Sequence, residues 1–268
     1  RSIPLSVTLM KINKIGIRVN AIKVFAVLLL GCIFSTKNMA ATQHINLVKP
    51  VVAAFKAGDK DTIAERVHYP LKRKAPLEAI KNKHMLIARF DEVFDKAFVE
   101  KITTSNIRHD WQMMGWRGIM FGSGKLWLDF DGSIWAVPYE SEAEKTRREA
   151  LIAKQKQHLH ESLREFTQPI LTWKTKKHLI RIDELAENQY RYAAWDITQT
   201  MADEPRIVIT GGTLSFDGSG GNHFYTFMNN GYRYVCHVIV LGTEQSPAGQ
   251  LEVFKNGVQV LSEPALDF

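Results

Sequence analysis

The sequence predicts an α+β protein with two folded units, and three patterns predict it. Apolar residues recur at helical spacing through residues 45–102. Alternating apolar and polar residues, typical of β-strands, follow up to residue 139 and dominate residues 167–268. A highly charged stretch, residues 140–166, lies between the two strand-rich parts. We therefore expect helices on an antiparallel sheet over residues 42–139, a linking helix, and then an antiparallel β-sandwich or small barrel.

Residues 1–41 have the layout of upstream residues followed by a bacterial secretory signal peptide, with Met10 as the expected start. Basic residues precede an uninterrupted apolar run of 12 residues, Val24–Ser35, and small residues end the segment. A membrane-spanning helix needs roughly 20 apolar residues, so this run is too short to span a bilayer. We expect export and cleavage near Ala40 or Ala41, which would leave a periplasmic or secreted protein.

A lipid anchor is the alternative fate of the same segment. The sequence LLGC at residues 29–32 approximates a lipobox, in which Cys32 would be acylated and would hold the protein to a membrane facing the periplasm. Ile33 and Phe34 continue the apolar run where a lipoprotein usually turns polar, which favours ordinary cleavage. Either product would lie outside the cytoplasm.

Removal of the signal segment changes the charge and the cysteine content. The whole chain carries a formal net charge of +7, but residues 1–41 hold six of the 35 basic residues and no acidic one. The remainder has 29 basic and 28 acidic residues, without the basic excess that nucleic-acid binding needs, so no nucleic-acid partner is expected. Cys236 is then the last cysteine, and its strand-like surroundings are typical of a small buried hydrophobe.

Three helices are expected to lead the first unit, and two of them have clear capping residues. The first helix should end at Gly58, and Asp59 is a plausible N-cap for a second one. Asn82 is expected to cap the helix that contains Met85 and Phe90. A further short helix should cover residues 96–102.

A β-hairpin is expected at the end of the first unit, where GKLWLDF and SIWAVPY flank Asp131 and Gly132. A two-residue turn there would pair Leu128 with Trp135. This register predicts a core face made of Leu126, Leu128, Phe130, Trp135 and Val137. The opposite face would carry Trp127, Asp129, Ile134 and Ala136.

The runs AGDKDTIAERVHYPLKRK, NKHMLIARFDEVFDKAFVEKI and WRGIMFGSGKLWLDFDGSIWAV resemble exported bacterial members of the nuclear transport factor two superfamily. The resemblance covers residues 45–138 and rests on the order of the elements. It implies a cystatin-like cone, with helices on a curved antiparallel sheet. Such cones host enzymes, ligand binders and interaction modules, so the resemblance implies no single activity.

The linking segment and the second unit have contrasting patterns. The composition of residues 140–166 predicts a solvated helix. This helix could still brace the two units through one stripe of apolar residues: Ala150, Leu151, Leu159, Leu163 and Phe166. Short strands dominate residues 167–268. Asn230-Gly231 and Asn256-Gly257 mark two tight hairpins there.

Two places are candidate binding sites. Trp127, with Trp116 nearby in sequence, is either part of the core or the floor of a ligand pocket in which Asp129 supplies a polar group. The glycine-rich stretch from Asp217 to His223 is either a hairpin connection or a functional loop that uses Asp217, Asn222 and His223. A phosphate-cradling loop would precede a helix, whereas strand-like runs flank this one.

The sequence contains no complete catalytic motif, and its histidines do not have metal-ligand spacing, so no catalytic residue, metal or cofactor is predicted. We expect a non-enzymatic binding protein of the bacterial envelope, whose partner is another protein or an envelope ligand. One specific form is an immunity or inhibitor protein against an envelope-acting toxin or hydrolase. The alternative is a small-ligand-binding or weakly catalytic cone that uses Trp127 and Asp129.

Overall fold

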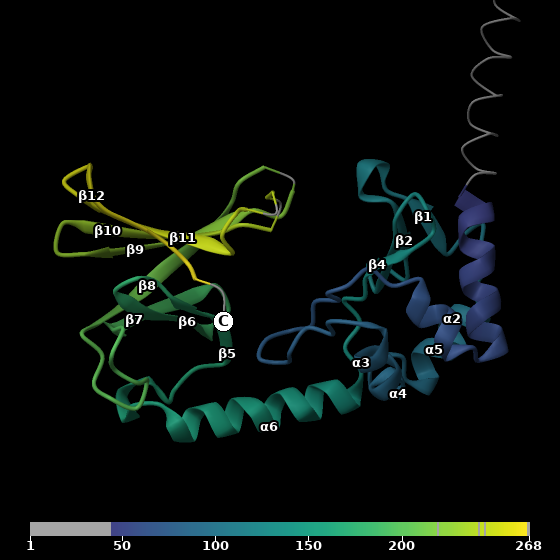
Figure 1. Cartoon of the computed structure of the whole chain (residues 1–268), viewed down its shortest axis with the longest axis horizontal. Coiled ribbons are helices and arrows are strands. Elements are labelled where there is room, and N and C mark those ends of the chain that lie inside the picture. Colours follow the sequence, from purple (N-terminus) through teal and green to yellow (C-terminus); the bar gives the residue numbers. More distant parts are fainter. Residues whose placement is uncertain (1–43, 219, 241, 244, 267–268) are drawn as a thin grey trace, which may run out of the picture.

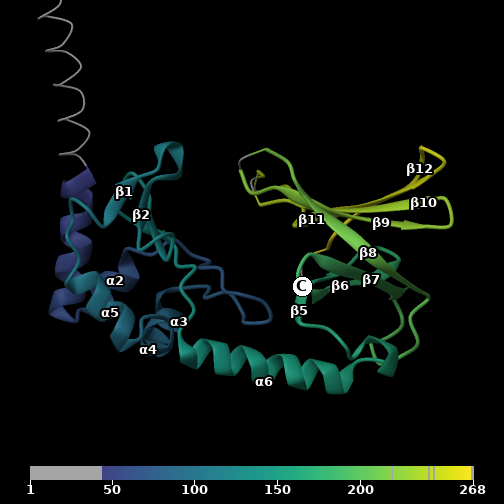
Figure 2. The same cartoon turned by 180° about the vertical axis from the view of Figure 1, so that it is seen from behind.

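The computed structural model describes residues 44–266, apart from positions 219, 241 and 244. It confirms an α+β protein, with two separate antiparallel sheets. Figure 1 shows the first unit at one end, the strand-rich second unit at the other, and helix α6 (Glu142–His158) running between them. Figure 2 shows the same arrangement from behind. The expected signal peptide and Cys32 lie outside the described residues.

Helices form most of the first unit, and the capping predictions are confirmed. The helices are residues 44–57, α2 (Lys60–Glu65), α3 (Lys83–Ala88), α4 (Phe90–Val93) and α5 (Lys96–Thr103). The Asp59 side chain accepts a hydrogen bond from the backbone N–H of Thr62 at 3.0 Å, and Asn82 does the same for Met85 at 3.0 Å. Each cap satisfies a donor that the first helical turn leaves free.

The first sheet has four very short strands in sequential order: β1 (Trp111–Met113), β2 (Ile119–Phe121), β3 (Leu126–Leu128) and β4 (Ile134–Ala136). One face of it packs on the helices. Trp111 and Phe121 stack there with ring centroids 4.5 Å apart, and Phe98 of α5 stacks on Tyr139 at 4.0 Å. The helices and this inner face thus share one hydrophobic core.

The predicted register of the β3–β4 hairpin holds where Trp127 pairs with Ala136 and is wrong by one residue next to the turn. Leu128 pairs with Ile134, because the backbone of Asp129 pairs with Ser133 and Gly132 adopts a positive φ of 82° in a longer turn. A turn with one more residue moves the following strand to the opposite face. Ile134 is therefore buried, whereas Phe130 and Trp135, both predicted as core, are 49% and 41% exposed.

The second unit is a single eight-stranded antiparallel sheet in which each strand pairs with the next along the chain, and the sheet curls into a half-barrel. Its strands are β5 (Gln168–Lys174), β6 (His178–Ala186), β7 (Gln189–Asp196), β8 (Ile207–Phe216), β9 (His223–Asn229), β10 (Tyr232–Val238), β11 (Gly249–Lys255) and β12 (Val258–Pro264). Asn230-Gly231 and Asn256-Gly257 form the two predicted tight turns, with positive φ at all four residues. A β-sandwich would need two sheets, so the barrel alternative describes this unit better.

The two edge strands of the half-barrel meet at one end. The backbone N–H of Leu266 donates to the carbonyl of Lys174 at 2.7 Å, beside an antiparallel bridge between these residues. The Glu263 carboxylate accepts hydrogen bonds from Thr175 Oγ1 at 2.5 Å and His178 Nδ1 at 3.1 Å. Glu263 thus ties β12 to the β5–β6 connection.

Helix α6 is fixed to the first unit by a fully buried carboxylate. Glu144 is 0% exposed and accepts hydrogen bonds from Arg73 Nε at 2.8 Å and Arg89 Nη2 at 3.4 Å. Arg73 also donates to the backbone carbonyl of Tyr139 at 2.7 Å. The Ser141 side chain caps the helix by accepting from the Glu144 backbone N–H at 3.1 Å.

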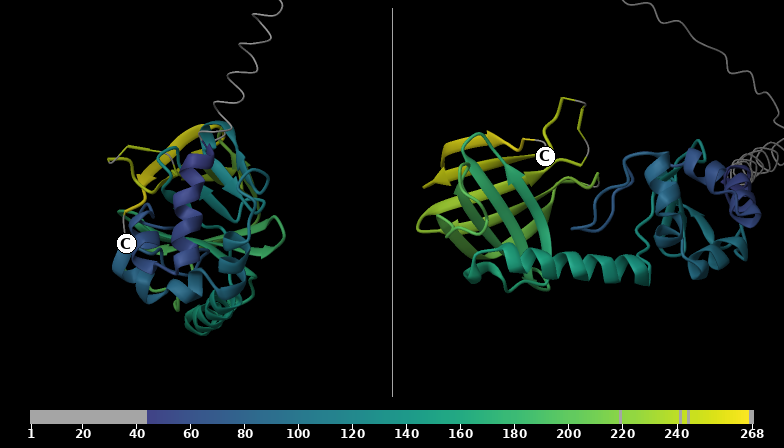
Figure 3. Two further views of the ribbon diagram at one scale, coloured as in Figure 1. Left: turned by 90° about the vertical axis from the view of Figure 1, so that its right-hand side faces the viewer. Right: turned by 60° about the horizontal axis from the view of Figure 1, so that its bottom comes forward.

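The other end of α6 packs on the convex face of the half-barrel (Figure 3). Beneath it lies a buried ionic cluster, in which Arg181 and Arg191 donate to Asp183 Oδ2 at 3.0 and 2.8 Å. Arg181 also reaches Gln155 of α6 at 3.1 Å, and Arg191 reaches the carbonyl of Leu163 at 2.7 Å, within the short helix η2 (Glu161–Leu163).

The predicted docking stripe is confirmed just after α6 and not within it. Leu159, Leu163 and Phe166 are buried there, whereas Ala150 of α6 is exposed and Leu151 is half-buried. Glu144 and Arg148 are buried in α6 instead. Charged side chains that find partners inside the protein replace the apolar contacts that the pattern predicted. In the described part of the chain, no helix has both the length and the apolar composition needed to cross a membrane.

Replacing Glu144 by glutamine should destabilise the protein by about 3 kcal/mol or more, because it leaves Arg73 buried without its carboxylate. Urea unfolding followed by circular dichroism measures the change. The matched control is Glu149→Gln on the exposed side of the same helix, which should stay within about 0.5 kcal/mol of wild type. Equal losses in both variants would contradict the anchoring role of Glu144.

The pH dependence of stability should reveal the Glu263 contacts. Burial raises the pKa of Glu263, but hydrogen bonds from Thr175 and His178 outweigh this effect and hold the pKa below its ordinary value. The stabilisation is therefore complete above the unfolded pKa and is lost as pH falls through the lower folded pKa. The stability difference between wild type and Glu263→Gln should shrink between about pH 7 and about pH 3 in parallel unfolding titrations. A constant difference would contradict this assignment.

Candidate functional site

The six predicted site residues do not form one site. Trp116, Trp127 and Asp129 lie in the first unit, whereas Asp217, Asn222 and His223 lie at the β8–β9 connection of the half-barrel. The two groups belong to different units of the protein (Figure 1). They are therefore considered separately.

The first sheet carries aromatic side chains on the face that points away from the helices. The strand register places Met120 opposite Trp127 and Trp127 opposite Ala136, in a row that alternates with the buried inner residues. Trp135 is the extra residue where the β3–β4 register shifts, and its ring centroid lies 5.9 Å from that of Trp127. We call Arg117, Met120, Trp127 and Trp135 the tryptophan face.

Contacts within the protein orient this face. Trp127 is half-buried, and its indole Nε1–H donates to the carbonyl of Gly124 at 3.1 Å. The Arg117 guanidinium lies 6.0 Å from the Trp127 ring centroid, in the range of a cation–π contact. Arg117 belongs to the short helix η1 (Gly115–Arg117), which connects β1 and β2. The ring of Trp127 is thus held in place while Trp135 remains 41% exposed.

Trp116 and Asp129 have different positions from those expected of a pocket floor and its polar group. Trp116 is 62% exposed and directly precedes Arg117 in η1. The Asp129 carboxylate accepts a hydrogen bond from the backbone N–H of Phe130 at 2.7 Å and so serves the hairpin turn. Trp116 is therefore an exposed residue of the β1–β2 connection, whereas Asp129 has a local structural role.

The glycine-rich stretch of the second unit is a strand connection. Phe216 pairs with His223, and the backbone N–H of Asp217 donates to the carbonyl of Asn222 at 2.8 Å. The Asn222 side chain accepts from the backbone N–H of Val240 at 2.8 Å. His223 Nδ1 lies 2.8 Å from the carbonyl of Gly221. These contacts join neighbouring loops of the half-barrel.

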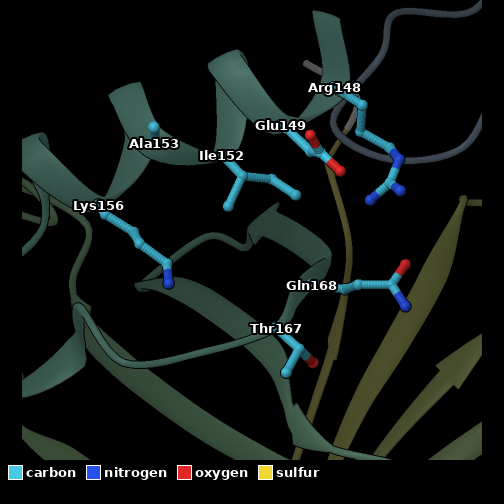
Figure 4. A pocket seen from close by; sticks show the side chains of 7 residues that line it. All are labelled: Arg148, Glu149, Ile152, Ala153, Lys156, Thr167 and Gln168. Carbon is cyan, nitrogen blue, oxygen red and sulfur yellow. The ribbon is translucent and has the colours of Figure 1, made fainter. Parts of the chain in front are cut away.

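An open groove of about 450 Å³ lies where α6 meets the start of β5. Figure 4 shows Ile152 in its middle, with Lys156 toward one end and Arg148 toward the other. Its two cationic side chains already have partners within the protein: Arg148 Nε donates to Glu140 at 2.5 Å, and Lys156 Nζ lies 4.9 Å from the ring centroid of Phe166. The groove therefore belongs to the attachment of α6.

Candidate chemistry at the cysteine and histidine residues is limited by their surroundings. Cys236 is completely buried in the half-barrel, and burial raises the pKa of its thiol, which disfavours the reactive thiolate. Among the described residues, no three histidine, cysteine or acidic side chains are placed to hold a metal ion. His158 ends α6, and His160 instead caps η2.

The sequence patterns did not identify Trp135 and Arg117 as site residues. Trp135 was placed in the core because the turn was taken as two residues long. The signal that points to Arg117 is its position beside Trp116, in a turn between two short strands. An arginine next to an exposed tryptophan is a common composition of binding surfaces.

No family model, curated protein or solved structure matches this chain. The resemblance of residues 45–138 to the nuclear transport factor two superfamily therefore stays a prediction.

Proposed function

We propose that this chain is an exported, non-enzymatic binding protein whose tryptophan face docks onto a folded partner protein. The observation that carries the proposal is the exposure of Trp135, at 41%, beside the half-buried Trp127 on a sheet whose other face packs against the helices. Large exposed aromatic side chains are unfavourable in water, and grouped ones mark interaction sites.

The composition of the face defines the chemistry of the partner. Tryptophan, methionine and arginine are enriched at the centres of protein interfaces, where they supply most of the binding energy. Arg117 forms no ion pair with any carboxylate of the described residues, and its guanidinium is available beside Trp127. A complementary partner surface would therefore present an apolar or aromatic patch next to a carboxylate.

The specific form of the proposal is an immunity or inhibitor protein that blocks a toxin or hydrolase acting in the bacterial envelope. Its support is the signal-peptide layout of residues 1–41 together with an aromatic docking face. Periplasmic or secreted location, the lipid anchor at Cys32 and the cone architecture of the first unit remain predictions. Helices packed on one side of a small antiparallel sheet support the cone.

A small-ligand pocket formed by Trp127 and Asp129 is less well supported. The Trp127 ring already contacts Trp135 and Arg117, and the Asp129 carboxylate binds the turn backbone. These contacts leave the two side chains on an open sheet face and a hairpin turn. A broad face of this kind suits a protein surface better than a small molecule.

Site-specific photocrosslinking in the source cells tests the proposal. Benzoylphenylalanine in place of Trp135 should give one reproducible protein adduct. The matched control is the same group in place of Val258, which is 66% exposed on the second unit and should not give that adduct. Identical adducts from both positions, or none from position 135, would contradict the proposed docking face.

With the crosslinked partner purified, Trp127→Ala should weaken binding by about 2 kcal/mol, as expected for the centre of an interface. Arg117→Glu should weaken it further at low salt, because it reverses the charge that meets the partner's carboxylate. Isothermal titration calorimetry measures both, with Val258→Ala as the control. Unchanged affinity in both tryptophan-face variants would rule out this surface.

A further inference from the structure

We infer that the half-barrel has its own binding site, for a small neutral ring compound with one hydrogen-bond acceptor, at the mouth formed by the start of β6 and the end of β7. A cavity of about 180 Å³ opens there on the concave side of the sheet. This site is separate from the tryptophan face and does not depend on the proposed docking function. Concave sheet interiors are common places for small ligands.

The cavity walls are apolar and aromatic. Leu251, Val253 and Leu261 come from β11 and β12, across the half-barrel from Tyr192 of β7. The rings of Tyr192 and Tyr234 lie 5.5 Å apart between centroids, at an interplanar angle of 37°. An apolar cavity of roughly 150 Å³ can hold benzene, so this space suits a single six-membered ring.

Tyr192 supplies the polar contact. Its side chain lines the cavity and its residue is only 2% exposed, yet its hydroxyl makes no hydrogen bond with any other residue that the structure describes. The hydroxyl is not one of the described side-chain polar atoms that are closed to solvent without a partner, so it is open to the cavity, where a ligand can reach it. Burial also raises the pKa of Tyr192 well above its ordinary value. The hydroxyl therefore stays protonated and can donate a hydrogen bond to a ligand.

The charged groups at the mouth are already paired, which defines the charge of the ligand. Arg206 Nη2 lies 2.6 Å from Asp196 Oδ2, and His178 Nδ1 lies 3.1 Å from Glu263. Arg206 therefore has a counter-charge, and the His178 ring is already bonded to Glu263. A neutral ligand that accepts from Tyr192 fits this arrangement better than an anion does.

Fluorine NMR titrations of the full chain with 4-fluorophenol and 4-fluorotoluene test the site. The two probes have the same shape, and only the first carries a hydroxyl oxygen that can accept from Tyr192. Wild type should bind both probes and should prefer 4-fluorophenol. Tyr192→Phe should weaken 4-fluorophenol by about five- to tenfold, the loss of one hydrogen bond, and leave 4-fluorotoluene unchanged.

A cavity-filling variant, Ala194→Leu, should abolish binding of both probes, since Ala194 lines the cavity. Circular dichroism and the melting temperature verify its fold. Leu261→Phe, on the opposite wall, replaces it if Ala194→Leu does not fold. Trp135→Ala is the matched control and should bind both probes as wild type does.

Three results would overturn the inference. These are a wild-type protein that binds neither probe, a folded cavity-filled variant that still binds them, and equal losses for both probes in Tyr192→Phe. Loss of partner crosslinking with probe binding intact would instead disprove the docking face alone.

Discussion

The buried Glu144 carboxylate is the contact on which the arrangement of this protein depends. It lies in the first turn of α6, and Arg73 and Arg89 of the first unit compensate its charge. The same helix then packs at its other end over the cluster of Arg181, Asp183 and Arg191 on the half-barrel. A buried carboxylate that lacks both water and an arginine partner is strongly unfavourable. Glu144 must therefore keep its contacts with the arginines, which fixes the position of α6 on the first unit. Helix α6 is consequently a structural element with two specific attachments, although its composition is that of a solvated linker.

Helix α6 holds apart two units that carry different surfaces, the tryptophan face and the cavity of the half-barrel. The first sheet uses its inner face for the core and exposes tryptophans on its outer face, whereas the half-barrel covers part of its convex face with α6 and keeps a cavity on the concave side. The first surface is an open sheet face and suits a protein, whereas the second is a cavity open at one end and suits a small molecule. Each follows from which face of its sheet the remainder of the chain covers. The proposed docking and the inferred ligand site can therefore be tested independently.

Features that depend on adjacent residues, such as helix caps, could be predicted from the sequence. Contacts between residues far apart in the chain could not. Asp59 and Asn82 were identified as caps because capping depends on a few adjacent residues. The β3–β4 hairpin was misread because Asp131-Gly132 suits a two-residue turn, while the observed turn is longer and sends Trp135 outward. The burial of Glu144 was not predictable, since its partner Arg73 is 71 residues away in the chain. The cavity was not predicted, because only the curvature of the sheet brings Tyr192 of β7 close to Tyr234 of β10.

The regular spacing of the buried positions on α6 has a consequence for how this protein can change in evolution. Glu144, Arg148 and Ile152, the buried residues of α6, lie along one side of the helix, so both attachments share the same helical phase. Inserting or deleting one residue between them would rotate one unit against the other by about 100° and separate one of the two sets of partners. Only changes of about seven residues, close to two full turns, would restore the phase. The distance between the two units is therefore expected to vary among descendants of this chain in discrete steps.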